Sequence, residues 1–201
     1  MVDTAENPVP TALGLLVLSS RTRDFLPGAY IQFLKVDGTE LSDPVVDEQT
    51  IDGPIAELLR RTEEKLNTHN RTAVNFTEAA LEKRKSAYPE VALQQLLRNS
   101  VMHRTYETTN APIRVTWYTD RIEIINPGGP FGSVTTESFG KPGVTDYRNP
   151  GLAEALKVLG FVQRFGAGIA TARRALQENG NPPPEFEVHP SHVGVTLRPP
   201  V

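Results

Sequence analysis

The strands that the sequence predicts come in pairs separated by only a few residues, and this spacing limits the sheets that the chain can build. Apolar and polar residues alternate over 113–117, and a second β-type run follows at 122–125. The gap is too short for the crossover that parallel strands need, so the two strands must form a hairpin. A second hairpin is predicted from 186–188 and 193–197. Because strands and helices do not alternate regularly, we expect an α+β fold with helices on one face of a sheet, and no Rossmann fold.

Four helices are predicted from apolar residues that recur every three or four positions. Their expected starts are Pro54, Pro89, Asn149 and Gly166. Their apolar stripes are Ile55, Leu58, Leu59 and Leu66, then Leu93, Leu96, Leu97 and Val101, then Leu152, Ala155, Leu156 and Leu159, and finally Ile169, Ala172 and Leu176. Nearer the N-terminus, the continuous apolar run Leu13–Leu18 predicts a buried strand, and residues 29–34 predict another.

Composition excludes several classes of protein. The chain of 201 residues is 38% hydrophobic, enough to bury a core, and it has no cysteine, which excludes disulfides, thiolate metal sites and a cysteine nucleophile. Its histidines are far apart except for His189 and His192, so we expect no all-protein zinc site. A net charge of −3 does not favour duplex binding. No apolar run approaches about 18 residues and the N-terminus is acidic, so we expect a cytoplasmic protein with no membrane partner.

The stretch from 126 to 147 is rich in glycine and shows no apolar periodicity. It contains five glycines and follows a predicted strand directly. Structureless loops longer than about 15 residues are uncommon in compact domains, where they tend to be lids, binding loops or disordered segments. We therefore expect one of these three roles.

Three local features could carry chemistry, and each has a plain structural alternative. Gly166-Ala167-Gly168 at a helix start can hold an anion or allow close helix packing. The sequence Asn126-Pro127-Gly128-Gly129 is either a turn or an amide at a strand end that reaches the edge of a ring. Gln95 and Asn99 share one helix face, which is either solvated or directed into a polar pocket where an amide oxygen can ligate Mg²⁺.

Taken in order, these features resemble the GHKL (histidine-kinase-type) ATP-binding fold. They are more similar still to one divergent branch, the bacterial transcriptional regulators often labelled RecG-related ATP-dependent helicases. The motifs that carry this resemblance are Tyr88-Pro89, Asn99–Arg104, Tyr106, Asp120–Ile124, Asn126–Gly129, Arg148–Pro150 and Gly166–Ile169. Pro10–Gly14 also resembles the segment that joins this domain to its usual N-terminal partner.

The resemblance implies a domain organisation and a set of partners. Residues 70–201 would form a GHKL-like two-layer sandwich, with helices on one face of a mixed, mostly antiparallel sheet, and residues 1–69 an α/β extension resembling the family's linker. Family members usually carry an N-terminal Schlafen-type AlbA DNA-binding domain, so we expect DNA contact only through a missing or separate domain. Nucleotide is the expected ligand, with a homodimer as a further expected partner. The helicase label has no support, because the sequence has no P-loop motif.

The resemblance also implies residue roles, with ATP and Mg²⁺ as cofactors. Asn99 would ligate Mg²⁺, and Asn126 stands where most relatives have an aspartate that accepts a hydrogen bond from the adenine amino group. The glycines Gly128 and Gly129 would let the backbone approach the base. The segment 130–147 would be the lid. The phosphate-binding positions would be Gly166, Gly168 and Ile169.

Two departures from the family pattern lower the expected activity. Gln95 stands where hydrolysing members carry a general-base glutamate, and an amide cannot accept a proton near neutral pH. Asn126 replaces the adenine-selecting aspartate. We therefore expect a nucleotide-binding regulatory module with weak or absent hydrolysis and no assigned catalytic residue. The alternatives are a degenerate dimerisation or interaction scaffold that binds no nucleotide, and an ATPase that uses Glu90 or His103 as its base.

Overall fold

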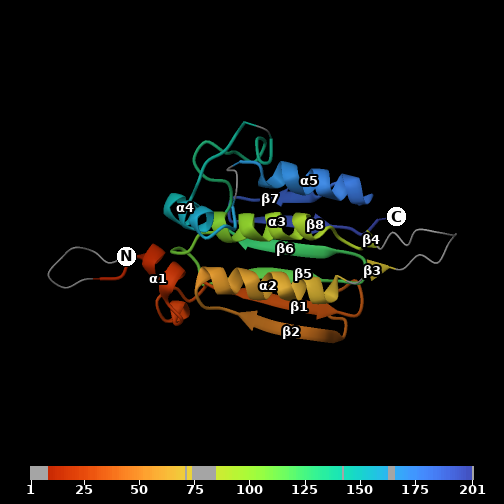
Figure 1. Ribbon diagram of the computed structural model, residues 1–201, viewed down its shortest axis with the longest axis horizontal. Coiled ribbons are helices and arrows are strands. Elements are labelled where there is room, and N and C mark those ends of the chain that lie inside the picture. Colours follow the sequence, from red (N-terminus) through yellow and green to blue (C-terminus); the bar gives the residue numbers. More distant parts are fainter. Residues whose placement is uncertain (1–8, 71, 74–84, 142, 163–165, 201) are drawn as a thin grey trace.

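The fold is built on a six-stranded sheet (Figure 1). The computed structural model describes residues 9–70, 72–73, 85–141, 143–162 and 166–200. The strand order of the sheet is β2-β1-β5-β6-β8-β7. The strands are β1 (Ile31–Val36), β2 (Val45–Ile51), β5 (Ile113–Trp117), β6 (Ile122–Pro127), β7 (Glu185–Val188) and β8 (His192–Leu197). All neighbours are antiparallel except β1 and β5, which are parallel. Both predicted hairpins are confirmed.

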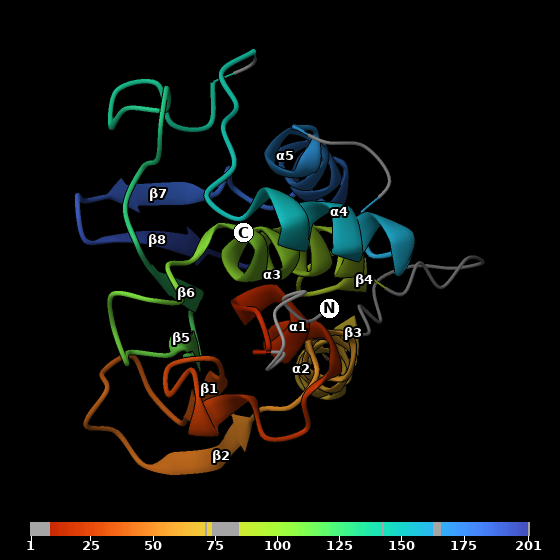
Figure 2. The same cartoon turned by 90° about the vertical axis from the view of Figure 1, so that its left-hand side faces the viewer.

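The helices lie together on one side of this sheet (Figure 2). They are α1 (Ala12–Leu18), α2 (Ile55–His69), α3 (Glu90–His103), α4 (Pro150–Val158) and α5 (Gly168–Asn179), with a 3₁₀ turn at Thr22–Asp24. A short ladder, β3 (Thr72–Ala73) and β4 (Lys85–Ser86), lies outside the main sheet. The predicted α+β class, with helices on one face of a mixed and mostly antiparallel sheet, is confirmed.

The core lies between the two layers, where the predicted helix stripes meet the inward residues of the strands. The most deeply buried side chains include Ile31, Phe33, Ile113, Val115, Ile122 and Ile124 from the sheet, and Leu59, Leu66, Leu93, Leu97, Leu152, Leu156 and Leu176 from the helices. On β6, burial follows the two-residue period of a strand, so Asn126 shares the helix-covered face with Ile122 and Ile124. The polar side chain of Asn126 therefore lies on the apolar, helix-covered face of the sheet.

One predicted strand is wrong. Residues 13–18 lie in helix α1, and the Thr11 side chain caps its start by accepting a hydrogen bond of 3.1 Å from the amide of Gly14. A short apolar run cannot distinguish a buried strand from a buried helix, and here the threonine cap favours the helix. A further strand, β2, was not predicted, because it lies at the edge of the sheet, only Ile51 of its seven residues is buried, and its apolar residues do not alternate with polar ones.

Elements on both sides of the predicted boundary at residue 69/70 share one sheet. The register of β1 and β5 places Ile31 opposite Ile113. The helices α2 and α3 are joined by the Arg98–Glu63 ion pair, in which Arg98 Nε lies 2.7 Å from Glu63 Oε1 and Nη2 lies 2.9 Å from Oε2. The division into 1–69 and 70–201 stays a prediction. In the described part of the chain, no helix has both the length and the apolar composition needed to cross a bilayer.

Candidate functional site

A cavity of about 420 Å³ is lined by residues of α3, the strands β6 and β8, the start of α5 and the glycine-rich loop that follows β6. Figure 2 shows how these elements are arranged. The cavity volume is within the range of small-molecule sites. All seven residues predicted for nucleotide or metal binding line it, namely Asn99, Asn126, Gly128, Gly129, Gly166, Gly168 and Ile169. The structure therefore brings together residues that are up to 70 positions apart in the sequence, while their individual roles stay predictions.

Asn126 places an unpaired acceptor in the wall of this cavity. Its side chain is 6% exposed, and its Oδ1 is buried without a hydrogen-bond partner. The backbone at this position is held in the sheet by pairing with Val193 of β8. This wall of the cavity therefore contains a buried acceptor that no protein donor satisfies.

Asn99 places a second unpaired amide at the opposite side, where α3 meets the start of α5. Its Nδ2 is buried without a partner. A Cβ at Gly168 would lie 2.7 Å from Asn99 Nδ2 and 3.2 Å from Gln95 Oε1. Glycine at 168 therefore lets the first turn of α5 pack against the side-chain amides of Gln95 and Asn99. This supports the packing interpretation of the motif and is also compatible with anion binding.

Three side-chain nitrogen or oxygen atoms of the described residues are buried without a hydrogen-bond partner. They are Asn99 Nδ2, Asn126 Oδ1 and Arg148 Nε. Each such atom costs about 1–3 kcal/mol of folding free energy. Two of the three belong to residues that line the same cavity, which is the pattern expected of groups kept for a ligand or for bound water.

The adjacent glycines are required by their own surroundings. A Cβ at Gly129 would lie 2.3 Å from the carbonyl oxygen of His189 and 2.4 Å from that of Pro190, in the β7–β8 turn. Gly128 has a φ of +102°, and its amide donates to the carbonyl of Ser191 at 2.8 Å. The turn between β7 and β8 therefore fixes this wall of the cavity. Close approach of these glycines to a base stays a prediction.

His103 contributes a neutral ring to the cavity. Burial, aided by the nearby positive charge of Arg148, lowers the pKa of His103 to about 4. The ring stacks on Tyr147, with centroids 5.6 Å apart and planes inclined by 23°. Arg148 is held beside it by donating from Nη2 to the carbonyl of Gly129 at 3.1 Å. Glu90, the other base considered from the sequence, does not line the cavity, and its Oε1 accepts hydrogen bonds from Asn67 and Gln94 at 2.9 Å each.

The described residues between Gly128 and Asn149 form neither helix nor strand, and they wall the cavity over most of this length. The loop is tied down locally: Asp146 accepts hydrogen bonds from the amides of Ser133 at 2.9 Å and Tyr147 at 2.8 Å, and these bonds lower the pKa of its carboxyl. Arg173 of α5 donates to the carbonyl of Gly140 at 2.9 Å. This segment covers the predicted lid at 130–147, of which residue 142 lies outside the described residues.

Several cavity residues were not predicted as site residues. The apolar ones include Leu96, Met102, Ile124, Phe131, Val134, Phe139, Phe186, Val193 and Val195, and the cationic ones are Lys141 and Arg173. Strand alternation in 193–197 marks Val193 and Val195 as sharing a face, which could have identified them. No sequence signal identifies Phe131 or Phe139, because the loop that carries them has no period.

One family model matches part of the chain. Residues 110–197 match the model described as "Putative ATP-dependent DNA helicase recG C-terminal", which supports an ATPase-like domain over this region. The matched region contains the predicted site residues from Asn126 to Ile169 but not Asn99. No curated protein matches the chain significantly.

A solved structure shares the fold. The crystal structure of the DIP2311 protein from Corynebacterium diphtheriae superposes with a TM-score of 0.80 at 24% sequence identity. The match covers 98% of this chain and 38% of that protein, so this chain spans well under half of the other's length. At this identity the likeness shows the fold alone.

Proposed function

We propose that the cavity binds an adenine nucleotide with Mg²⁺ and that the chain is a nucleotide-responsive regulatory module of a bacterial transcriptional regulator, with weak or absent hydrolysis. The observation that carries this proposal is the pair of unpaired buried amide atoms, Asn99 Nδ2 and Asn126 Oδ1, in one cavity of the ATPase-like domain. A ligand that paired both would offset the free energy that these two unpaired buried atoms cost the fold.

The adenine ring would lie at the sheet end of the cavity. Asn126 Oδ1 is an acceptor, and the exocyclic amino group of adenine is a donor, so the two are complementary. Neighbouring apolar side chains, among them Ile124 and Val195, would cover the ring faces. Guanine presents a carbonyl oxygen at the corresponding position, which would face the Asn126 oxygen without a hydrogen bond.

The phosphates would lie at the other end, beside the first turn of α5. Free backbone amides at the start of this 12-residue helix and the cationic side chains of Lys141 and Arg173 favour negative charge there. Asn99 reaches the same place, since a Cβ at Gly168 would touch its amide. This donor set fits Mg²⁺, which takes one or two protein oxygens and completes its shell with phosphates and water. A 180° rotation of the Asn99 amide would exchange Nδ2 and Oδ1, so that Oδ1 would take the position without a protein partner and could ligate Mg²⁺ there.

Weak hydrolysis follows from the groups available to activate water. Gln95 beside Asn99 cannot act as a base. His103, with its pKa lowered to about 4, is neutral but weakly basic. Asp146 is the acidic residue among the described cavity residues, and both of its oxygens already accept backbone hydrogen bonds. The alternative of a scaffold without ligand predicts a cavity filled by apolar side chains, whereas the open volume and unpaired amides favour binding.

A thermal melt with and without 5 mM ATP and Mg²⁺ tests the proposal. At about 100 times the dissociation constant, binding adds about 2.7 kcal/mol, and each kcal/mol raises the Tm of a chain this long by roughly 2–4 °C. We expect a rise of about 5–11 °C in the native chain and in Asn110→Ala, an exposed asparagine outside the cavity, and a much smaller rise in Asn99→Ala. Absence of a shift in the native chain would favour the scaffold.

A further inference from the structure

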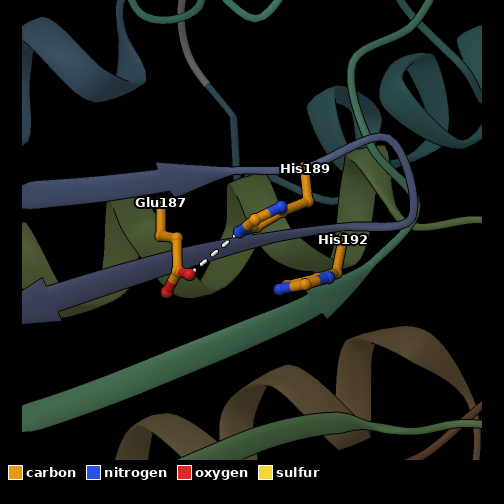
Figure 3. A group of neighbouring side chains, drawn as sticks. All are labelled: Glu187, His189 and His192. Atoms are coloured by element: carbon orange, nitrogen blue, oxygen red, sulfur yellow. Dashed lines mark hydrogen bonds and ion pairs between the residues drawn. The ribbon is translucent and has the colours of Figure 1, made fainter.

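Three potential metal ligands meet at the tip of the β7–β8 hairpin, outside the cavity (Figure 3). Glu187 comes from the end of β7, and His189 and His192 flank the turn between the strands. Each residue offers a ligand atom, and these three atoms lie within 4.8 Å of one another. The pair His189 and His192 alone gives no expectation of a zinc site from the sequence, but the fold places a third ligand, Glu187, beside them.

The hairpin holds these side chains in a fixed arrangement. The amide of His189 donates to the carbonyl of His192 at 2.9 Å, which closes the turn. The two imidazole rings are stacked, with centroids 4.7 Å apart and planes inclined by 19°. His189 Nε2 lies 2.9 Å from Glu187 Oε1, so carboxylate and imidazole already face each other. Little reorganisation would be needed for all three to share one ion.

We propose that Glu187, His189 and His192 form a surface site for a divalent transition-metal ion of the zinc class. Two imidazole nitrogens and one carboxylate oxygen are typical of Zn²⁺ and its first-row neighbours, whereas Mg²⁺ prefers oxygen ligands alone. Ser191 Oγ lies 3.1 Å from His192 Nδ1. A hydrogen bond donated by Nδ1–H to this hydroxyl leaves the Nε2 lone pair for the metal, as outer partners of ligating histidines commonly do.

The alternative is an ordinary surface ion pair between Glu187 and His189. Their side chains are 74% and 48% exposed, and such pairs contribute about 0–1 kcal/mol. An ion pair alone gives no role to His192, and it predicts no saturable metal binding. The exposure suits a three-ligand site whose remaining coordination positions are open to solvent.

Metal binding here would strengthen the hairpin that supports the cavity wall. The Ser191 carbonyl accepts from the amide of Gly128, and the backbone of His189 and Pro190 packs against Gly129. An ion that links β7 to the turn would therefore raise the Tm in the absence of nucleotide. The proposal does not depend on nucleotide binding, and either can fail without the other.

The test is a calorimetric titration of the full chain, freed of any histidine tag, with ZnCl₂ in a buffer that does not chelate metals. We expect one equivalent of Zn²⁺ to bind per chain and millimolar Mg²⁺ not to compete. His189→Ala, His192→Ala and Glu187→Gln should each weaken binding by at least the roughly 10–100-fold that loss of an outer partner costs. Glu185→Gln, which removes an exposed carboxylate from the same strand, is the matched control and should bind as the native chain does.

A second readout separates loss of the site from loss of the fold. Each ligand variant should melt within a few degrees of the metal-free native chain but lose the rise in Tm that Zn²⁺ produces. The proposal is overturned if the native chain binds no Zn²⁺. It is equally overturned if folded ligand variants bind as tightly as the control, because the ion would then lie elsewhere.

Discussion

Replacing Asn126 by leucine should stabilise the protein while removing its ligand site. The two side chains branch at the same atom and have similar size, so leucine can occupy the position without a new cavity. The native asparagine is 6% exposed and leaves Oδ1 unpaired. Removing that buried acceptor should recover about 1–3 kcal/mol, which corresponds to a rise in Tm of roughly 2–12 °C for a chain this long.

The assay is urea denaturation and thermal melting of the ligand-free chain, with Asn149→Leu as the matched control. Asn149 is also an asparagine beside α3, but its Nδ2 donates to the carbonyls of Met102 at 2.9 Å and Arg104 at 2.8 Å. Asn149→Leu removes the donor to both carbonyls and should lower the free energy of unfolding by about 1–3 kcal/mol. The two variants are therefore expected to shift stability in opposite directions. If Asn126→Leu destabilises the chain as Asn149→Leu does, Asn126 is a structural partner and the reasoning fails.

Three further predictions concern the surroundings of the cavity and the core. The folded-state pKa of His103, about 4, lies below the ordinary 6.5, so the unfolded chain binds the proton first as the pH falls. Between pH 7 and 5 the free energy of unfolding of the native chain should therefore fall by about 2 kcal/mol more than that of His103→Gln, measured by urea denaturation. Equal losses in the two chains would contradict the buried neutral ring. Gly129→Ala should cost about 1–3 kcal/mol, because its Cβ would lie 2.3 Å from the His189 carbonyl oxygen; an unchanged Tm would show that the hairpin yields freely. Arg98→Met should lower the free energy of unfolding by about 3 kcal/mol, because it leaves Glu63 without its charge partner. Adding Glu63→Gln should restore part of that stability. If urea denaturation of the double variant shows no recovery, the loss comes from packing and not from the unpaired charge.

Much of the fold follows from local patterns in the sequence. The helices α2 and α3 and the β5–β6 hairpin bury their apolar stripes as their periods predict. The run 13–18 was assigned incorrectly because six apolar residues fit either a strand or a helix, and the decisive Thr11 cap lies outside the run. The strand β2 was not predicted, because an edge strand contacts the core on one side only and β2 therefore lacks a clear apolar period.

The site divides in the same way. Residues in recognisable motifs, such as Asn99 and Asn126, were identified and do line one cavity. Its loop residues Phe131 and Phe139 were not, because a segment without a period gives no indication of which side chains point inward. The Glu187–His189–His192 cluster was missed since it depends on a hairpin register that folds a strand residue beside a turn.

The central claim is that the cavity binds an adenine nucleotide, and calorimetric titration of the full chain with ATP in excess Mg²⁺ tests it most directly. We predict one saturable site, tighter for ATP than for GTP. In Asn126→Leu, binding should be lost although that chain is folded and at least as stable as the native one. If the native chain produces no binding heat at several temperatures, or if Asn126→Leu binds ATP as tightly as the native chain, the cavity is not the nucleotide site that its unpaired amides indicate.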